Sequence, residues 1–259
     1  MKKIYLAAAT LFLVSSCATY KVKYAETVSQ QQLKSPVVEP IHTFYLIGDA
    51  GKSPMGELNP VLKTLQSELI EAPKNSSVIF LGDNIYPAGM PKKEDKKAYQ
   101  EAKNHLDAQI SAVKEFGGRT IFIPGNHDWY ANGIKGLKRQ EKYIEDHLKG
   151  KDVFLPENGC PLAKVEINDE VTLLVVDTQW YLEDWDKHPG INDDCDIKDR
   201  GKFLDELSGQ IKKNRGKTTL IALHNPMFTY GSHGGEFSLK QHIFPTGGGV
   251  PLPFLGTLI

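Results

Sequence analysis

Residues 78–86 read Val-Ile-Phe-Leu-Gly-Asp-Asn-Ile-Tyr. The four apolar residues Val78–Leu81 are bounded by polar turn residues, a pattern that predicts a short buried strand. Gly82 permits a tight turn directly after the strand, and Asp83 follows at once. This stretch therefore predicts a strand that ends in a carboxylate.

The same pattern, an apolar strand followed by a polar turn, occurs three more times along the chain. The carboxyl ends of strands in an open α/β sheet are where ligands gather. The further predicted strands and their turns are His42–Gly48 with Asp49-Ala50-Gly51, Thr120–Ile123 with Gly125-Asn126-His127-Asp128, and Thr218–Leu223 with His224-Asn225-Pro226.

Helical patterns separate these strands. Asn59 and Pro60 predict a helix start, with Asn as N-cap and Pro in the first turn, and apolar residues then recur at helical spacing from Val61 to Ile70. Further helices are expected at residues 98–113, Leu137–Leu148 and 203–211, and a further strand at Val171–Val176. Strands that alternate with helices predict an α/β fold.

Composition narrows the class of protein. The chain has 259 residues, is 40% hydrophobic and carries a formal net charge of -1. This is enough for one domain with a substantial core. The balanced charge indicates neither a nucleic-acid-binding surface nor an acidic tail, so function has to be inferred from local motifs.

The N-terminus has the features of an export signal. Lys2 and Lys3 precede the apolar run Ile4–Val14, which is too short to span a bilayer but typical of a secretory signal. The following Val-Ser-Ser-Cys17 resembles a bacterial lipobox, which implies cleavage before Cys17 and lipidation of its thiol. The alternative is an ordinary signal peptide with an incidental cysteine.

We therefore expect a signal peptide at residues 1–16, a tether at residues 17–41 and the main domain at residues 42–259. The protein would be exported and lipid-anchored to the bacterial cell envelope, at the outer membrane or the periplasmic face. Cys160 and Cys195 then remain, and an even pair in an oxidising compartment predicts a disulfide. Two free buried thiols are the alternative.

The turns after the four strands carry candidate metal ligands. Asp49, Asp83, Asn126 and His224 offer oxygen and nitrogen donors, a mixture that suits iron, manganese or zinc. One aspartate can bridge two ions through its two oxygens. Two ions at such a site can hold both the attacking and the leaving oxygen of a phosphate ester.

In their order and spacing, these motifs resemble those of the calcineurin-like metallophosphoesterases. Tyr86, three residues after Asp83, resembles the purple acid phosphatase branch of that family. The resemblance implies a four-layer α/β/β/α sandwich that binds two metal ions, iron with iron, zinc or manganese. It also implies hydrolysis of a phosphate ester, from a small molecule or a phosphoprotein, by hydroxide generated at the metals.

The resemblance also implies a role for each residue. Asp49 and Tyr86 would bind the first metal, Asp83 would bridge both, and Asn126 and His224 would bind the second.

Two histidines would act on the substrate. His127 would lie over the substrate phosphate, and His233 would orient the phosphate or protonate the leaving group. The family's closing Gly-His-x-His segment does not follow His233. We therefore expect a C-terminally truncated domain with little activity. The alternatives are an inactive surface lipoprotein on the same scaffold, and a phosphodiesterase or nucleotide hydrolase.

Three residues near these motifs are assigned structural roles. We expect Trp129 and Tyr130 to pack in the core, with the mouth of the site as the alternative for both. Asp177 follows the strand Val171–Val176 and is interpreted as a turn or packing carboxylate.

Overall fold

The computed structural model describes residues 39–183, 188–227, 239 and 243. The chain divides into two compact units, Met1–Ile41 and His42–Ile259, and the elements below belong to the second. The predicted signal peptide, Cys17 and His233 lie outside the described residues. Within the described part of the chain, no helix is both long enough and apolar enough to cross a bilayer.

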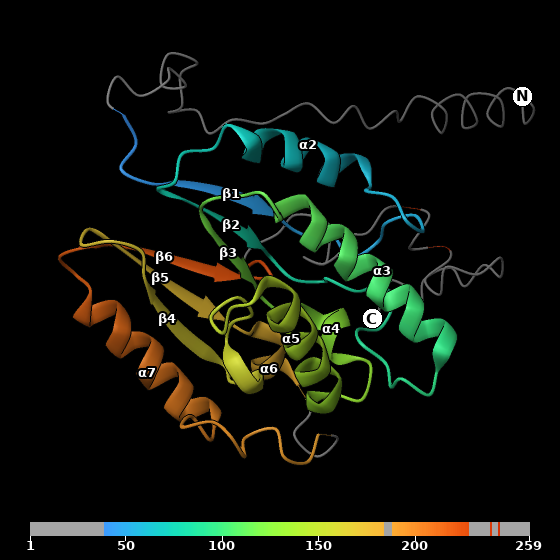
Figure 1. Cartoon of the computed structure of the whole chain (residues 1–259). Coiled ribbons are helices and arrows are strands. Elements are labelled where there is room, and N and C mark those ends of the chain that lie inside the picture. The colour runs from blue at the N-terminus through green and yellow to red at the C-terminus, as the bar shows by residue number, and fades with distance from the viewer. Residues whose placement is uncertain (1–38, 184–187, 228–238, 240–242, 244–259) are drawn as a thin grey trace, which may run out of the picture. The chain divides into compact units, whose positions relative to one another are not determined.

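The first sheet contains the strands that precede three of the four candidate ligand turns. Its strands are β1 (Thr43–Ile47), β2 (Ser76–Phe80) and β3 (Arg119–Phe122), in the order β1-β2-β3. Both pairings are parallel, with Val78 opposite Tyr45 and Thr120. All three strands therefore end at the same edge of the sheet, as Figure 1 shows.

The second sheet contains β4 (Leu162–Glu166), β5 (Val171–Val176) and β6 (Thr218–Leu223). β5 and β6 are parallel and have the predicted bounds, whereas β4 runs antiparallel to β5. Strand β4 was not predicted, because it lacks the continuous apolar run that marks a strand buried on both faces. In β4 only Val165 is buried, and the charged Lys164 and Glu166 beside it are exposed.

Helices flank the two sheets. Figure 1 shows α2 and α3 along the first sheet and α7 along the second. The mixed α/β class is confirmed, while the complete four-layer arrangement stays a prediction. The helical elements are α2 (Pro60–Ile70), α3 (Lys96–Val113), α4 (Asn126–Trp129), α5 (Ile134–Leu148), the 3-10 turn η2 (Glu157–Gly159), α6 (Thr178–Leu182) and α7 (Arg200–Lys213).

Helix α2 begins as predicted, but fewer of its apolar residues are buried than the helical pattern suggested. Asn59 caps it by accepting a hydrogen bond from the backbone N–H of Leu62 at 2.9 Å. Leu62 and Leu65 are buried, whereas Val61 and Ile70 are 61% and 75% exposed. Because the helix packs on one side only, apolar residues beyond that stripe remain in solvent.

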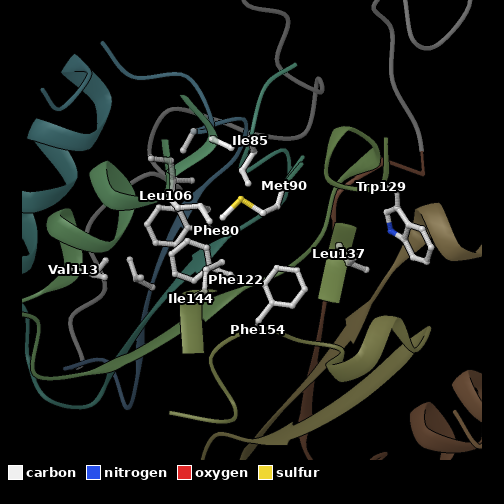
Figure 2. Packing of buried hydrophobic residues seen from close by; sticks show 14 of the residues in the cluster. Phe80, Ile85, Met90, Leu106, Val113, Phe122, Trp129, Leu137, Ile144 and Phe154 are labelled. Carbon is white, nitrogen blue, oxygen red and sulfur yellow. The ribbon is translucent and has the colours of Figure 1, made fainter. Parts of the chain in front are cut away.

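Strands β2 and β3 of the first sheet bury side chains on both faces, because successive side chains point to opposite sides. In β1, by contrast, Leu46 is 61% exposed. On the helix side, the rings of Phe80 and Phe122 stack with centroids 4.1 Å apart, and Leu106 lies in the same cluster (Figure 2). On the other side, Ile79 and Ile121 pack with residues of the second sheet. Burial on both faces explains why these strands read as continuous apolar runs.

A disulfide joins Cys160 to Cys195, with their Cα atoms 5.4 Å apart. Cys160 lies just before β4, and Cys195 lies in the segment before α7. The bond thus ties the start of an edge strand to the segment that leads into α7, the helix along the same sheet.

Candidate metal centre

The candidate ligands meet where β1, β2, β3 and β6 end. Asp49, Asp83 and His224 each offer a donor atom, and these three atoms lie within 4.8 Å of one another. They border a cavity of about 490 Å³. The side chains that line this cavity are Asp49, Asp83, Tyr86, Asn126, His127, Leu182, His224, Asn225 and Pro226.

Both candidate carboxylates lie on unusual backbone. Asp49 and Asp83 have φ angles of 56° and 55°, in the left-handed region that residues other than glycine seldom adopt. Such backbone persists only where its surroundings hold it in place. Here Asp49 N–H donates to Gly82 O at 3.1 Å, and Gly51 N–H donates to Asp83 O at 3.0 Å. The two loops therefore hold each other in this conformation.

Close approach of the loops requires glycine at two positions. Gly82 has a φ of +93°, and a Cβ there would lie 2.7 Å from His224 Nδ1. A Cβ on Gly125 would lie 2.3 Å from Asp83 Oδ1. The glycines noted in the sequence motifs are thus needed for space as well as for turning.

Asp83 lies at the centre of the site. Its Oδ2 accepts the Tyr86 hydroxyl at 2.7 Å. Its Oδ1 accepts the backbone N–H of His127 at 2.9 Å and lies 3.5 Å from His224 Nε2. The two oxygens of one carboxylate therefore face two different groups of donors.

Tyr86 lies between two carboxylates. Its hydroxyl oxygen is 2.6 Å from Asp49 Oδ1 as well as 2.7 Å from Asp83 Oδ2. Burial, and then hydrogen bonding to both carboxylates, raise the pKa of Tyr86. A multivalent cation at this position would oppose that effect and favour the phenolate.

The geometry of His224 is suited to binding a metal ion. Its Nδ1 lies 2.8 Å from the Leu81 carbonyl, which can only accept, so Nδ1 donates and a neutral ring has its lone pair on Nε2. That Nε2 faces Asn126 Oδ1 at 3.1 Å and Asp83 Oδ1 at 3.5 Å. Three lone pairs then converge, an arrangement that either a metal ion or a proton on Nε2 would satisfy. A carbonyl that orients the ring in this way is typical of metal-ligating histidines, so these residues fit a metal ion.

His127 lies at the rim of the cavity. Its Nδ1 is 2.6 Å from the Pro87 carbonyl, and its Nε2 is 3.9 Å from Asp83 Oδ2. The ring packs against Tyr86, with centroids 4.5 Å apart. The Pro87 carbonyl thus fixes the ring, so that Nε2 is the nitrogen near the candidate ligands.

Tyr130 departs from the expected core packing, whereas Trp129 conforms to it. Trp129 is fully buried, but Tyr130 is 53% exposed. The Tyr130 hydroxyl accepts a hydrogen bond from Asn126 Nδ2 at 2.6 Å, which leaves the amide oxygen facing His224. A spacing of four residues from Asn126 could have indicated this contact, since such residues meet on a helical turn.

Leu182 was not anticipated, because α6 was not predicted. It is 61% exposed and lines the cavity. Asp177 caps α6 by accepting the Trp180 N–H at 3.0 Å, and it also accepts Trp129 Nε1 at 3.0 Å. Asp177 therefore has the structural role that the sequence predicted, and through this role it positions a helix that reaches the site.

Comparisons with known proteins agree with this geometry. Residues 42–250 match the model of the calcineurin-like phosphoesterase family. A relative, purple acid phosphatase 7 of Arabidopsis thaliana, is 25% identical over 225 residues. That match covers 83% of this chain, and the chain spans 63% of the relative's length.

Among solved structures, the chain is similar to a protein of unknown function from Aquifex aeolicus, with 16% identity and a TM-score of 0.33. That match covers 73% of this chain and 83% of the other. The family match at residues 42–250 spans most of the chain. The protein therefore belongs to the calcineurin-like phosphoesterases, a family of metal-dependent hydrolases of phosphate esters.

Proposed function

We propose that the protein hydrolyses phosphate monoesters at two metal ions that share Asp83. The observation that carries this proposal is the division of the Asp83 carboxylate. Oδ2 faces Tyr86, which also contacts Asp49, and Oδ1 faces His224, which also contacts Asn126. One bridging carboxylate between two donor groups is the arrangement that a two-metal phosphoesterase needs.

In this proposal Asp49 and Tyr86 hold the first ion, and Asn126 and His224 hold the second. The mixture of carboxylate, phenol, amide and imidazole suits iron paired with iron, zinc or manganese. When bound, the two ions lower the pKa of a coordinated water and withdraw charge from the phosphate.

The other residues at the rim would contact the substrate. The Pro87 carbonyl holds His127 Nδ1, so Nε2 is free to contact a phosphate oxygen and offset its charge. Leu182 and Pro226 line the same cavity and offer apolar surface to the organic group of the ester. His233, outside the described residues, would orient the phosphate or protonate the leaving group.

The experiment is to load the protein with iron and record its visible spectrum and its phosphatase activity. A tyrosinate on ferric iron absorbs visible light, so the wild type should be coloured and Tyr86→Phe should be bleached. The matched control is Tyr130→Phe, which removes a hydroxyl that contacts Asn126 instead and should keep the colour. An active wild type that stays colourless would contradict the role of Tyr86.

A substrate panel tests the type of ester. We expect turnover of phosphate monoesters to exceed that of diesters and nucleotides. Preference for a diester would instead favour the phosphodiesterase alternative, and failure to bind metal would favour an inactive scaffold.

We also propose that the protein is exported and anchored to the cell envelope through a lipid on Cys17, a position outside the described residues. The support is the short apolar run Ile4–Val14 that ends next to Val-Ser-Ser-Cys17. Two or more lipid chains are sufficient for stable anchoring. Cys17→Ser should move the protein from the detergent phase to the soluble fraction, and unchanged partitioning would contradict lipidation.

A further inference from the structure

Asp128 is a fully buried carboxylate that accepts five N–H groups. Its Oδ1 accepts Asn84 N–H at 3.0 Å, Ile85 N–H at 3.2 Å and Gln140 Nε2 at 3.0 Å. Its Oδ2 accepts Gly125 N–H at 2.8 Å and Asn84 Nδ2 at 3.0 Å. Both oxygens are thus fully engaged, and none of these partners lines the cavity.

Four of these hydrogen bonds join the two loops that carry the central ligands. Asn84 and Ile85 directly follow Asp83, whereas Gly125 directly precedes Asn126. Asp83 and Asn126 are far apart in the sequence, so their separation in space depends on contacts between the loops. Asp128 supplies such a contact to each loop at once.

Asn84, one of the residues that donate to Asp128, makes further hydrogen bonds that hold the two loops together. Its Nδ2 also donates to the Ile123 carbonyl at 2.8 Å, at the end of β3. Its own carbonyl accepts Gln109 Nε2 from α3 at 2.8 Å. Gln140 approaches Asp128 from α5. Two long helices therefore support the contact, and neither loop can shift without breaking buried hydrogen bonds.

We propose that Asp128 is a positioning residue that fixes the distance between Asp83 and Asn126 and thereby sets the affinity of the site for metal. This inference rests on the proposed metal site. Asp128 does not touch the metals in this proposal; it acts through Asp83 and Asn126. Loss of such an outer contact typically lowers metal affinity or activity by roughly 10–100-fold.

The alternative is that Asp128 only stabilises the fold, and the chain contains a matched control for this. Asp177 is likewise fully buried and accepts Trp129 Nε1 and Trp180 N–H. It binds no backbone N–H of the loops that carry Asp83 and Asn126. In both positions asparagine would present an amide to an existing donor, so both substitutions should lower stability.

The experiment measures the affinity of the full chain for Mn²⁺ by competition with a chelating dye, and the melting temperature without metal. Asp128→Asn and Asp177→Asn should both melt earlier than the wild type. Only Asp128→Asn should also bind Mn²⁺ more weakly, by about 10–100-fold. A milder variant, Gln140→Leu, removes one of the five donors to Asp128 and should weaken binding by a few-fold, which keeps the test valid if Asp128→Asn does not fold.

Two results would overturn the inference about Asp128 while leaving the proposed metal site intact. One is wild-type affinity for Mn²⁺ in Gln140→Leu and in folded Asp128→Asn. The other is an equal loss of affinity in Asp177→Asn, because the loss would then follow general stability. A wild-type protein that binds no Mn²⁺, Zn²⁺ or iron would overturn both the inference and the proposed metal site.

Discussion

The two sheets have three strands each, yet they contribute very unequally to the candidate metal centre. All three strands of the first sheet are parallel, and their ends provide Asp49, Asp83 and Asn126. In the second sheet only β6 provides a candidate ligand, His224, while β4 runs antiparallel to its neighbour. Parallel strands end together at one edge, so strand direction decides how many ligands a sheet can bring to one site.

The second sheet supports the centre in other ways. The turn after β5 provides Asp177, which binds Trp129, and Thr178, whose hydroxyl lies 2.7 Å from Asn225 Oδ1 beside His224. The disulfide ties this sheet to the segment before α7. We therefore expect substitutions at the ligand edge of the first sheet to affect metal binding and activity. Substitutions in the second sheet away from His224 should affect mainly stability.

The largest expected effect is the loss of Asp83. Asp83→Ala removes the carboxylate that faces both donor groups, so metal content and activity should both fall. Activity should fall by at least the roughly 10–100-fold that is typical of losing an outer contact to a metal ligand. Metal analysis and phosphatase assays of the purified variant measure this. Residual activity above that of an Asp49→Ala variant would contradict the central place of Asp83.

The next prediction compares a glycine beside the ligand edge of the first sheet with a glycine in α7, along the second sheet. In Gly125→Ala the new Cβ would lie 2.3 Å from Asp83 Oδ1, so the ligand loop must move, with a loss of about 1–3 kcal/mol and a marked loss of activity. Gly209→Ala, in α7, meets nothing within 4 Å and should stabilise the protein by about 1 kcal/mol. Urea unfolding and activity assays test the pair. If Gly125→Ala keeps full activity, the close packing of the loops is unimportant.

Removing the disulfide should separate stability from activity. The cysteines are 35 residues apart in the sequence, and opening a loop of that length lowers stability by about 3–4 kcal/mol. Cys160→Ala combined with Cys195→Ala should unfold at lower urea, yet the folded fraction should keep wild-type activity per molecule. A large fall in activity of the folded fraction would show that the second sheet determines the metal site more directly.

A smaller, pH-dependent effect is expected from Asp177. Burial raises the pKa of its carboxyl from 3.8 to about 7, although the hydrogen bonds that the carboxyl accepts act in the opposite direction and lower the pKa. Between these values the unfolded chain has released its proton while the folded chain keeps it, so stability falls as pH rises from about 4 to about 7. Asp177→Asn cannot ionise and should show a flatter decline in urea unfolding between pH 4 and 7, whereas an unchanged slope would contradict the raised pKa.

Much of the fold could be predicted from the sequence, because buried strands and helices have clear patterns. β5 and β6 have the predicted bounds, and Asn59 caps α2 as expected. β4 escaped prediction because it is half-exposed, and α6 because five residues give too little periodicity. Exposure of Val61 and Ile70 could not be predicted either, since the width of the buried stripe depends on what packs against α2.

The sequence by itself determined which residues could carry the chemistry. Each candidate ligand lies in the turn that follows an apolar strand, and this order can be read from the local sequence. Only the tertiary structure decided how those residues meet: the sharing of Asp83 between two donor groups, the contact of Tyr130 with Asn126, and the buried carboxylate of Asp128 between two loops. These contacts join residues from separate strands and helices, so they depend on strand order and packing, which no local pattern contains.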